Sequence, residues 1–165
     1  MKEKSIELLN RAVADELTAV HQYMFFHFHC DDQGYDLLAG LFKQTAIEEM
    51  GHVEKLAERI IFLNGDVEMV SSSGVQKIHD VKKMLEMAAN METASADDYN
   101  KWALECSKIA DSVSKTIFEE LVVDEERHFD QYDEEISNLA KFGDNYLALQ
   151  SIERSKNRAA GQPAD

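Results

Sequence analysis

Hydrophobic side chains recur at alternating intervals of three and four residues along four long stretches of the chain. This spacing puts them on one face of an α-helix and is typical of helices that pack in bundles. The dipeptides Gln33-Gly34 and Asn64-Gly65 interrupt the pattern with residues that favour turns. The pattern predicts four long helices, within residues 6–30, 38–63, 81–109 and 117–139.

The segments that connect these stretches differ in length. Residues 65–77, GDVEMVSSSGVQK, lack the helical period and are predicted to form a loop. At about 3.3 Å per extended residue, this loop can run the length of a bundle. We therefore expect a crossover that makes the first and third helices antiparallel. Asp111 and Ser112 can cap the fourth helix, and residues 145–156, after Gly143, predict a short fifth.

The sequence thus predicts an all-α fold, a four-helix bundle with a long crossover between helices two and three and a short C-terminal helix. A length of 165 residues suits one domain, assigned to residues 1–157, with residues 158–165 as a flexible tail. A single proline, with 44% hydrophobic and 30% charged residues, favours long helices over sheet.

Charge and cysteine usage narrow the class of protein. A formal net charge of −15 argues against direct binding to nucleic acids or anionic membranes. No stretch approaches the roughly 20 apolar residues of a membrane span, and the N-terminus does not resemble a signal peptide, so we expect a cytoplasmic protein. Cys30 and Cys106 form no CxxC motif, which excludes a zinc ribbon or rubredoxin-type iron site. The crossover puts them at opposite ends of the bundle, as reduced, buried thiols.

Polar side chains interrupt the apolar faces at regular positions. They are four glutamates and two histidines: Glu16, Glu49, His52, Glu92, Glu125 and His128. Glu49 follows Glu16 by 33 residues, and the two later glutamates have the same spacing. A shift of 76 residues carries each of these positions in the first half onto one in the second, and carries Tyr23 onto Tyr99. The chain therefore repeats one arrangement twice.

These six side chains can meet at one height, because residues equidistant from the turn of an antiparallel helix pair lie level. Taken singly, each is more often a structural polar residue, and a plain bundle with a polar layer is one alternative. Four buried carboxylates, however, are costly unless cations compensate them, and two divalent cations balance their charge. One glutamate from each of two helices and Glu-x-x-His from each of the others is the ligand set of di-iron and di-manganese bundles. Chemistry with dioxygen or peroxide favours iron over manganese.

Several segments resemble the bacterioferritins, a family of the ferritin-like di-iron proteins, in the family's order. They are ADELTAVHQY, IEEMGHVEKLAERIIFLNG, VVDEERHFD and FGDNYLALQSI. The resemblance implies that the six residues are ferroxidase ligands for two iron ions per subunit, with Glu49 and Glu125 bridging and Glu16 and Glu92 terminal. It also implies that Tyr23 lies beside the site.

The function implied by this resemblance is iron storage and detoxification. Fe(II) would be oxidised with O2 or H2O2, and the ferric mineral would be stored in a shell of 24 subunits built from two-fold dimers. The fifth helix would line the four-fold channels, and an electron-donor protein would serve iron release.

Met50 extends the resemblance to a haem site. It lies one residue after Glu49 and is therefore turned off the apolar stripe toward the outside. In bacterioferritins, the methionine at this position from each of two subunits ligates a b-type haem between them. The alternative is a methionine that packs in a dimer interface without haem. Lys43 departs from the family's aromatic residue near the haem, and Gln44 and Glu48 replace a histidine and an aspartate that hold an additional iron in some members.

Two other di-iron classes remain as alternatives. A rubrerythrin-like peroxidase would transfer electrons rather than store iron, but such proteins usually carry a CxxC-based iron centre. A DNA-protecting mini-ferritin of 12 subunits usually builds its iron site between chains, whereas here one chain supplies all six candidate ligands. The absence of a basic tail also counts against the mini-ferritin.

Overall fold

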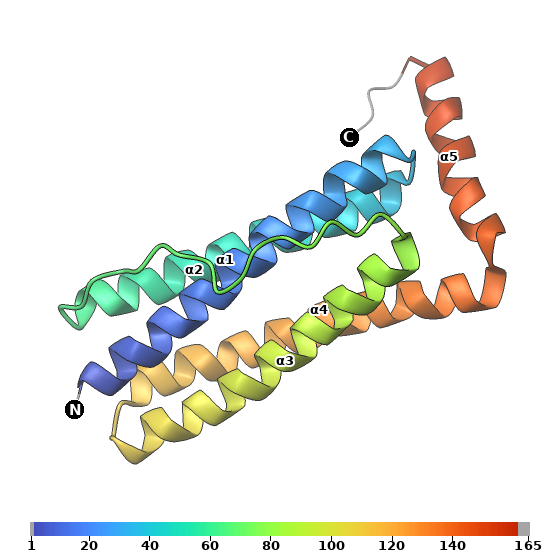
Figure 1. The fold of residues 1–165 in the computed structure, drawn as a ribbon. Helices are drawn as coiled ribbons and strands as arrows, with labels where there is room; N and C mark the ends of the chain where they lie inside the picture. Colours follow the sequence, from blue (N-terminus) through green and yellow to red (C-terminus); the bar gives the residue numbers. More distant parts are fainter. Residues whose placement is uncertain (1, 162–165) are drawn as a thin grey trace.

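The computed structural model describes residues 2–161, and its regular structure is helical throughout this range. The helices are α1 (Lys2–Asp32), α2 (Asp36–Phe62), α3 (Val81–Lys108), α4 (Ser112–Phe142) and the shorter α5 (Asp144–Ala159) (Figure 1). This confirms the predicted all-α fold with four long helices and a short fifth. None of these helices is both long and apolar enough to span a membrane.

Local chemistry explains where the helices begin and end. Gly34, with a φ of +83°, adopts the left-handed conformation in the turn between α1 and α2. Asn64 does the same after α2, with a φ of +60°. The Asp80 carboxylate caps α3, and the Asp111 carboxylate caps α4 by accepting a hydrogen bond from the backbone N–H of Ser114. The residues at these helix ends therefore favour ending one helix and beginning the next.

The segment between α2 and α3 runs along α1 from one end of the bundle to the other (Figure 1). Asn10 donates a hydrogen bond to the carbonyl of Asp66 at 2.9 Å, and Gln22 donates one to the carbonyl of Gln76 at 3.0 Å. The segment thus follows α1 in the same direction, and α3 then runs back antiparallel to α1. The predicted crossover is confirmed.

Helix α5 turns away from α4 at Gly143 and crosses the end of the bundle beside the α1–α2 turn (Figure 1). The buried Gln150 accepts a hydrogen bond from the backbone N–H of Leu38, and Ser151 donates one to the carbonyl of Gly34 at 3.3 Å. The helix extends to Ala159. Residues 162–165 of the predicted tail lie outside the described residues.

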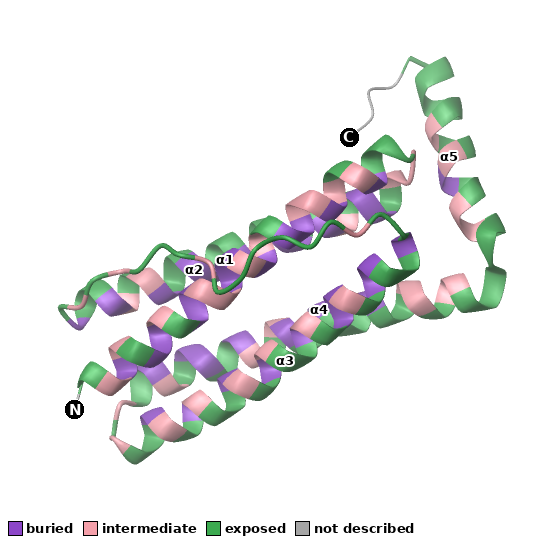
Figure 2. Cartoon of the chain, viewed as in Figure 1, coloured by how far each residue is buried: buried purple, intermediate pink, exposed green. Residues whose placement is uncertain are grey.

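The core consists of two apolar clusters, one toward each end of the bundle. Figure 2 shows the buried positions spread along the long helices. The first contains Leu9 and Cys106, and the second contains Phe26 and Cys30. Both thiols are buried and free, as predicted for cysteines at opposite ends. A polar layer separates the two clusters on all four long helices, and it contains the six residues singled out by the repeat.

Candidate metal centre

Each long helix contributes to the polar layer between the clusters. Glu16 comes from α1 and Glu92 from α3, while α2 and α4 each provide a glutamate and a histidine three residues apart, about one helical turn. None of the six residues is more than 7% exposed. The heptad positions that bury leucines elsewhere on these helices therefore bury carboxylates and imidazoles here.

The six residues form two overlapping groups. The first comprises Glu16, Glu49, His52 and Glu125, and the second comprises Glu49, Glu92, Glu125 and His128. Within each group the potential ligand atoms all lie within 4.8 Å of one another. The glutamates shared by both groups, Glu49 and Glu125, are those for which the resemblance to the bacterioferritins implied a bridging role.

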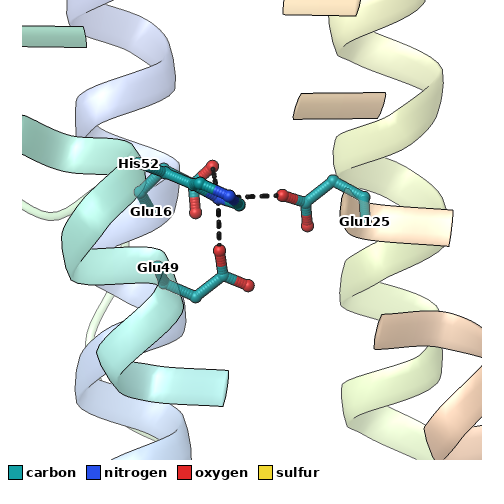
Figure 3. Close-up of side chains that lie close together, drawn as sticks. All are labelled: Glu16, Glu49, His52 and Glu125. Atoms are coloured by element: carbon teal, nitrogen blue, oxygen red, sulfur yellow. Dashed lines mark ion pairs between the residues drawn. The ribbon is translucent and has the colours of Figure 1, made fainter. Parts of the chain in front are cut away.

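Figure 3 shows the first group, in which the His52 ring is surrounded by three carboxylates. Nδ1 of His52 lies 2.7 Å from Glu49 Oε2 and 3.3 Å from both Glu16 Oε1 and Glu125 Oε1. In the second group, His128 Nδ1 lies 3.2 Å from Glu49 Oε1 and 3.4 Å from Glu92 Oε2. Both Nδ1 atoms therefore point into the space enclosed by the carboxylates.

Several of these atoms lack a hydrogen-bond partner although they are buried. They are both carboxylate oxygens of Glu49, one oxygen each of Glu92 and Glu125, and Nδ1 of His52 and His128. They approach one another at ion-pair distance but without the direction of a hydrogen bond. Buried polar atoms are rarely left in this state, and a pair of divalent cations would satisfy all of them. The donor set of oxygens with one nitrogen per group fits iron or manganese.

The electrostatics of the layer show how it holds protons when no cation compensates the charge. Burial and the charge of Glu49 raise the pKa of Glu16 well above its usual range, and burial and the charges of Glu16 and Glu49 raise that of Glu125. Burial would also raise the pKa of Glu49, but the contacts with the two histidines bring it to about 2. Burial disfavours charged His128, yet its glutamate neighbours raise its pKa to about 10. Cation binding must therefore displace protons from the layer.

The outer nitrogens of the two histidines contact acidic residues nearer the surface. His52 Nε2 lies 3.1 Å from Asp124 Oδ2, and His128 Nε2 lies 2.7 Å from Glu48 Oε2. Such contacts orient an imidazole so that its other nitrogen faces a metal. The role of Asp124 was not predicted from the sequence, although the shift of 76 residues maps Glu48 onto Asp124 and was the available signal.

Two tyrosines connect the layer across α1 and α3. Tyr23 donates a hydrogen bond to Glu92 Oε1, and Tyr99 donates one to Glu16 Oε1 at 2.6 Å. This crosswise pairing follows from the antiparallel orientation of the two helices. Tyr23 thus lies beside the site, as predicted, while the equivalent contact of Tyr99 was not predicted. The Tyr132 ring packs 5.6 Å from the Tyr23 ring.

Met50 lies outside this layer, on the outer surface of α2. Its side chain is 46% exposed, and Ile47, one turn earlier, is 61% exposed. This agrees with the outward orientation expected from the helical period. Gln44 is also exposed and donates a hydrogen bond to Glu48 at 3.2 Å.

Comparison with known proteins places this fold and site in a class. A sequence model of the ferritin-like domain matches residues 6–142. The chain is 37% identical to a bacterioferritin of Desulfovibrio desulfuricans over 89% of this chain and 82% of that protein. It is 38% identical to a bacterioferritin of Brucella melitensis over 86% of this chain and 88% of that protein. Fold and site therefore define a ferritin-like bundle with a carboxylate–histidine centre.

A solved structure of the D. desulfuricans bacterioferritin superimposes with a TM-score of 0.89 at 37% identity. The match covers 91% of this chain and 88% of the other, which is described as having a diiron site. The chain belongs to the bacterioferritin family.

Proposed function

We propose that this protein stores iron and that the six-residue layer is a ferroxidase centre, which oxidises Fe(II) to Fe(III). The observation that carries this proposal is the set of buried, unpartnered ligand atoms facing one another from four helices. The ferritin-like domain and the bacterioferritin relatives support iron as the metal. In this centre each Fe(II) gives one electron to O2 or hydrogen peroxide.

The six residues are proposed to have different roles as metal ligands. Glu49 and Glu125 are proposed to bridge the two metal positions, since each belongs to both groups of ligand atoms. Glu16 and Glu92 are proposed as terminal ligands, each with one oxygen occupied by a tyrosine hydroxyl. His52 and His128 would bind through Nδ1. Four carboxylate charges against two divalent cations make the occupied layer neutral, which removes the cost of burying unpaired charge.

Tyr23 is proposed as a residue of the catalytic centre because it touches a ligand. Its hydroxyl holds one oxygen of Glu92, which leaves the other oxygen, itself unpartnered, to face the metal position. Burial and the neighbouring carboxylate raise the pKa of Tyr23 well above its usual range, so the phenol keeps its proton and remains a donor.

Storage requires an assembly, and we propose a shell of 24 subunits built from two-fold dimers. Exposed apolar side chains on the outer faces of the helices, such as Phe28, Ile47 and Leu149, support extensive contacts between subunits. Exposed Met50 on α2 is proposed to ligate a b-type haem together with the same residue of a second subunit. The two free thiols suit a cytoplasmic location, where an electron-donor protein would serve iron release.

The test of the proposed centre is the rate of Fe(II) oxidation in the assembled protein. Glu49→Ala removes a ligand of both metal positions and should reduce the rate of the rapid phase of oxidation at least about 100-fold. Removing only a hydrogen-bond partner of a ligand already costs about 10–100-fold in activity, and the loss of a shared ligand should cost at least as much. Glu54→Ala, on an exposed position of the same helix, is the matched control and should oxidise Fe(II) as the parent does. Equal rates for parent and Glu49→Ala would refute the centre.

Assembly and haem are tested separately. Gel filtration should give a particle of about 24 chains that retains iron, whereas a dimer without mineral would favour the rubrerythrin-like peroxidase. Met50→Ala should remove a Soret absorption band from protein produced with haem, while Met69→Ala, another exposed methionine, should leave it. A band unchanged by Met50→Ala would make Met50 an interface residue only.

A further inference from the structure

The two halves of the metal centre are related by the repeat but are not equal. The shift of 76 residues maps Glu48 onto Asp124 and Gly51 onto Arg127. The histidines and their acidic partners therefore occur in both halves, whereas a guanidinium occurs in one half only. One fixed positive charge thus distinguishes the surroundings of the two histidines.

Arg127 lies over the surface acids that contact both histidines. Its Nη2 lies 2.6 Å from Glu48 Oε2, 3.2 Å from Asp124 Oδ1 and 3.4 Å from Nε2 of His128. Among the described contacts, Arg127 has none with His52. The guanidinium therefore contacts the imidazole of His128 itself, whereas near His52 it contacts only the acidic partner, Asp124.

The acidic partners of the two histidines, Glu48 and Asp124, also differ in which oxygen they offer to Arg127. Glu48 offers the same oxygen, Oε2, to His128 and to Arg127. Asp124 offers Oδ2 to His52 and the other oxygen, Oδ1, to Arg127. An acidic partner increases the basicity of a metal-bound imidazole. A guanidinium that shares the same oxygen, at the shorter distance of 2.6 Å, weakens that effect more for His128 than the contact with the other oxygen, at 3.2 Å, weakens it for His52.

The two histidines also differ in how accessible they are from solvent, and the His52 group is the more accessible one. The His52 side chain is 8% exposed, whereas that of His128 is fully buried beneath the Glu48–Arg127 ion pair. A cation approaching from this face therefore meets the His52 group first, and the guanidinium repels it at the His128 group.

We propose that Arg127 makes the two metal positions unequal, so that a divalent cation occupies the Glu16–His52 position before the Glu92–His128 position. This inference rests on the proposed metal centre, since both positions belong to it. Arg127 is a positioning residue that acts through charge and through Glu48, and it is not itself a ligand.

Lys55 provides a matched control on the same face of the bundle. It lies three residues after His52 on α2, is about as exposed as Arg127 (43% against 45%) and pairs with Glu120 rather than with an acid that contacts a histidine. Replacing either residue by glutamine removes one positive charge near the centre, but only Arg127→Gln removes a charge in contact with a histidine.

The experiment is a Co(II) titration of the assembled, metal-free protein, followed by calorimetry and by the absorption of bound Co(II). The parent should bind in two resolved steps. Arg127→Gln should tighten the weaker step about tenfold, the order expected for one partly screened charge at the edge of a site. Arg127→Lys, which keeps the charge, should retain the separation, and Lys55→Gln should match the parent. An unchanged ratio of affinities in Arg127→Gln overturns the inference.

Crystals given one equivalent of Co(II) per chain assign the steps to positions. Anomalous scattering should be stronger at the Glu16–His52 position in the parent and equal at both positions in Arg127→Gln. Equal peaks in the parent, or a stronger peak beside His128, overturn this inference and leave the proposed function intact. Co(II) at neither position would overturn the metal centre and the inference together.

Discussion

The polar layer and the two apolar clusters on either side of it are built on the same four helices, yet they are constructed in opposite ways. In the clusters, buried apolar side chains contact one another, with Leu9, Phe26 and Phe42 fully buried. In the layer, equally buried positions carry carboxylates and imidazoles, and several of their inward atoms have no hydrogen-bond partner. The clusters stabilise the fold, whereas the layer destabilises it unless cations are bound.

This difference explains how the layer can exist. Close-packed clusters on both sides fix the helices, and the helices then hold six ligands at one level whether or not a metal is present. The structure therefore predicts that substitutions in the two regions have opposite effects on the stability of the metal-free protein.

The largest effect on stability is expected in a cluster. Leu9→Ala should lower the free energy of unfolding of the metal-free protein by about 2–5 kcal/mol, because it opens a cavity in a fully buried position. The number of metal ions bound per chain should not change, since Leu9 lies away from the layer. Denaturant unfolding and metal analysis of the same samples check both statements, and a loss of bound metal would contradict the separation of the regions.

A smaller effect of opposite sign is expected in the layer. Glu16→Gln should raise the free energy of unfolding of the metal-free protein at pH 8 by about 1–3 kcal/mol, because a buried carboxyl group whose ionisation is disfavoured by burial and by Glu49 is replaced by a neutral group of the same shape. The amide oxygen can still accept the hydrogen bond from Tyr99. A destabilised Glu16→Gln protein would show that the carboxylate contributes to the fold without metal.

The free energy of unfolding of the metal-free protein should depend on pH, by about 1.4 kcal/mol for each pH unit over which a group keeps its proton in the fold but has lost it in the unfolded chain. The pKa of Glu16 and Glu125 is raised in the fold, and that of His128 is raised from 6.5 to about 10, so the native state binds more protons than the unfolded chain. The contribution of His128 is complete below pH 6.5 and is lost as the pH rises toward 10.

Thermal unfolding between pH 6 and 9 measures this trend. The melting temperature of the metal-free protein should fall as the pH rises. Metal-saturated protein should not show this fall, because metal binding requires deprotonated ligands and strengthens with pH. A metal-free melting temperature that rises over this range would contradict the assigned protonation states.

No effect is expected from mild oxidation of the cysteines. Cys30 and Cys106 belong to different clusters, with the metal layer between them, so they cannot approach to the roughly 7 Å between Cα atoms that a disulfide requires. Non-reducing mass spectrometry after oxidation should find both thiols unlinked within the chain. A Cys30–Cys106 bridge would contradict the crossover topology.

The sequence was sufficient to predict the helices and the six residues of the layer, because both follow from periodicity. The crossover was predicted from the length of the loop between the second and third helices. An acid on an apolar helical face, repeated at a fixed spacing, specifies both the face and the height of a side chain. Met50 could be assigned to the outer surface on the same ground.

Contacts that depend on side-chain conformation across helices could not be predicted in this way. Arg127 reaches Glu48 from another helix, and the periodic pattern of either helix only marks both as surface positions. The orientation of α5 likewise depends on single hydrogen bonds, such as that from the Leu38 N–H to Gln150. The sequence therefore identifies the candidate ligands, and the structure identifies the residues that make their surroundings unequal.

The most direct test of the metal layer is diffraction at the iron absorption edge from crystals saturated with Fe(II) without oxygen. Two anomalous peaks per chain are predicted inside the bundle, one in contact with Glu16 and His52 and one in contact with Glu92 and His128, both touching Glu49 and Glu125. A layer without iron, or with iron bound only by surface acids such as Glu48 and Asp124, would contradict the account.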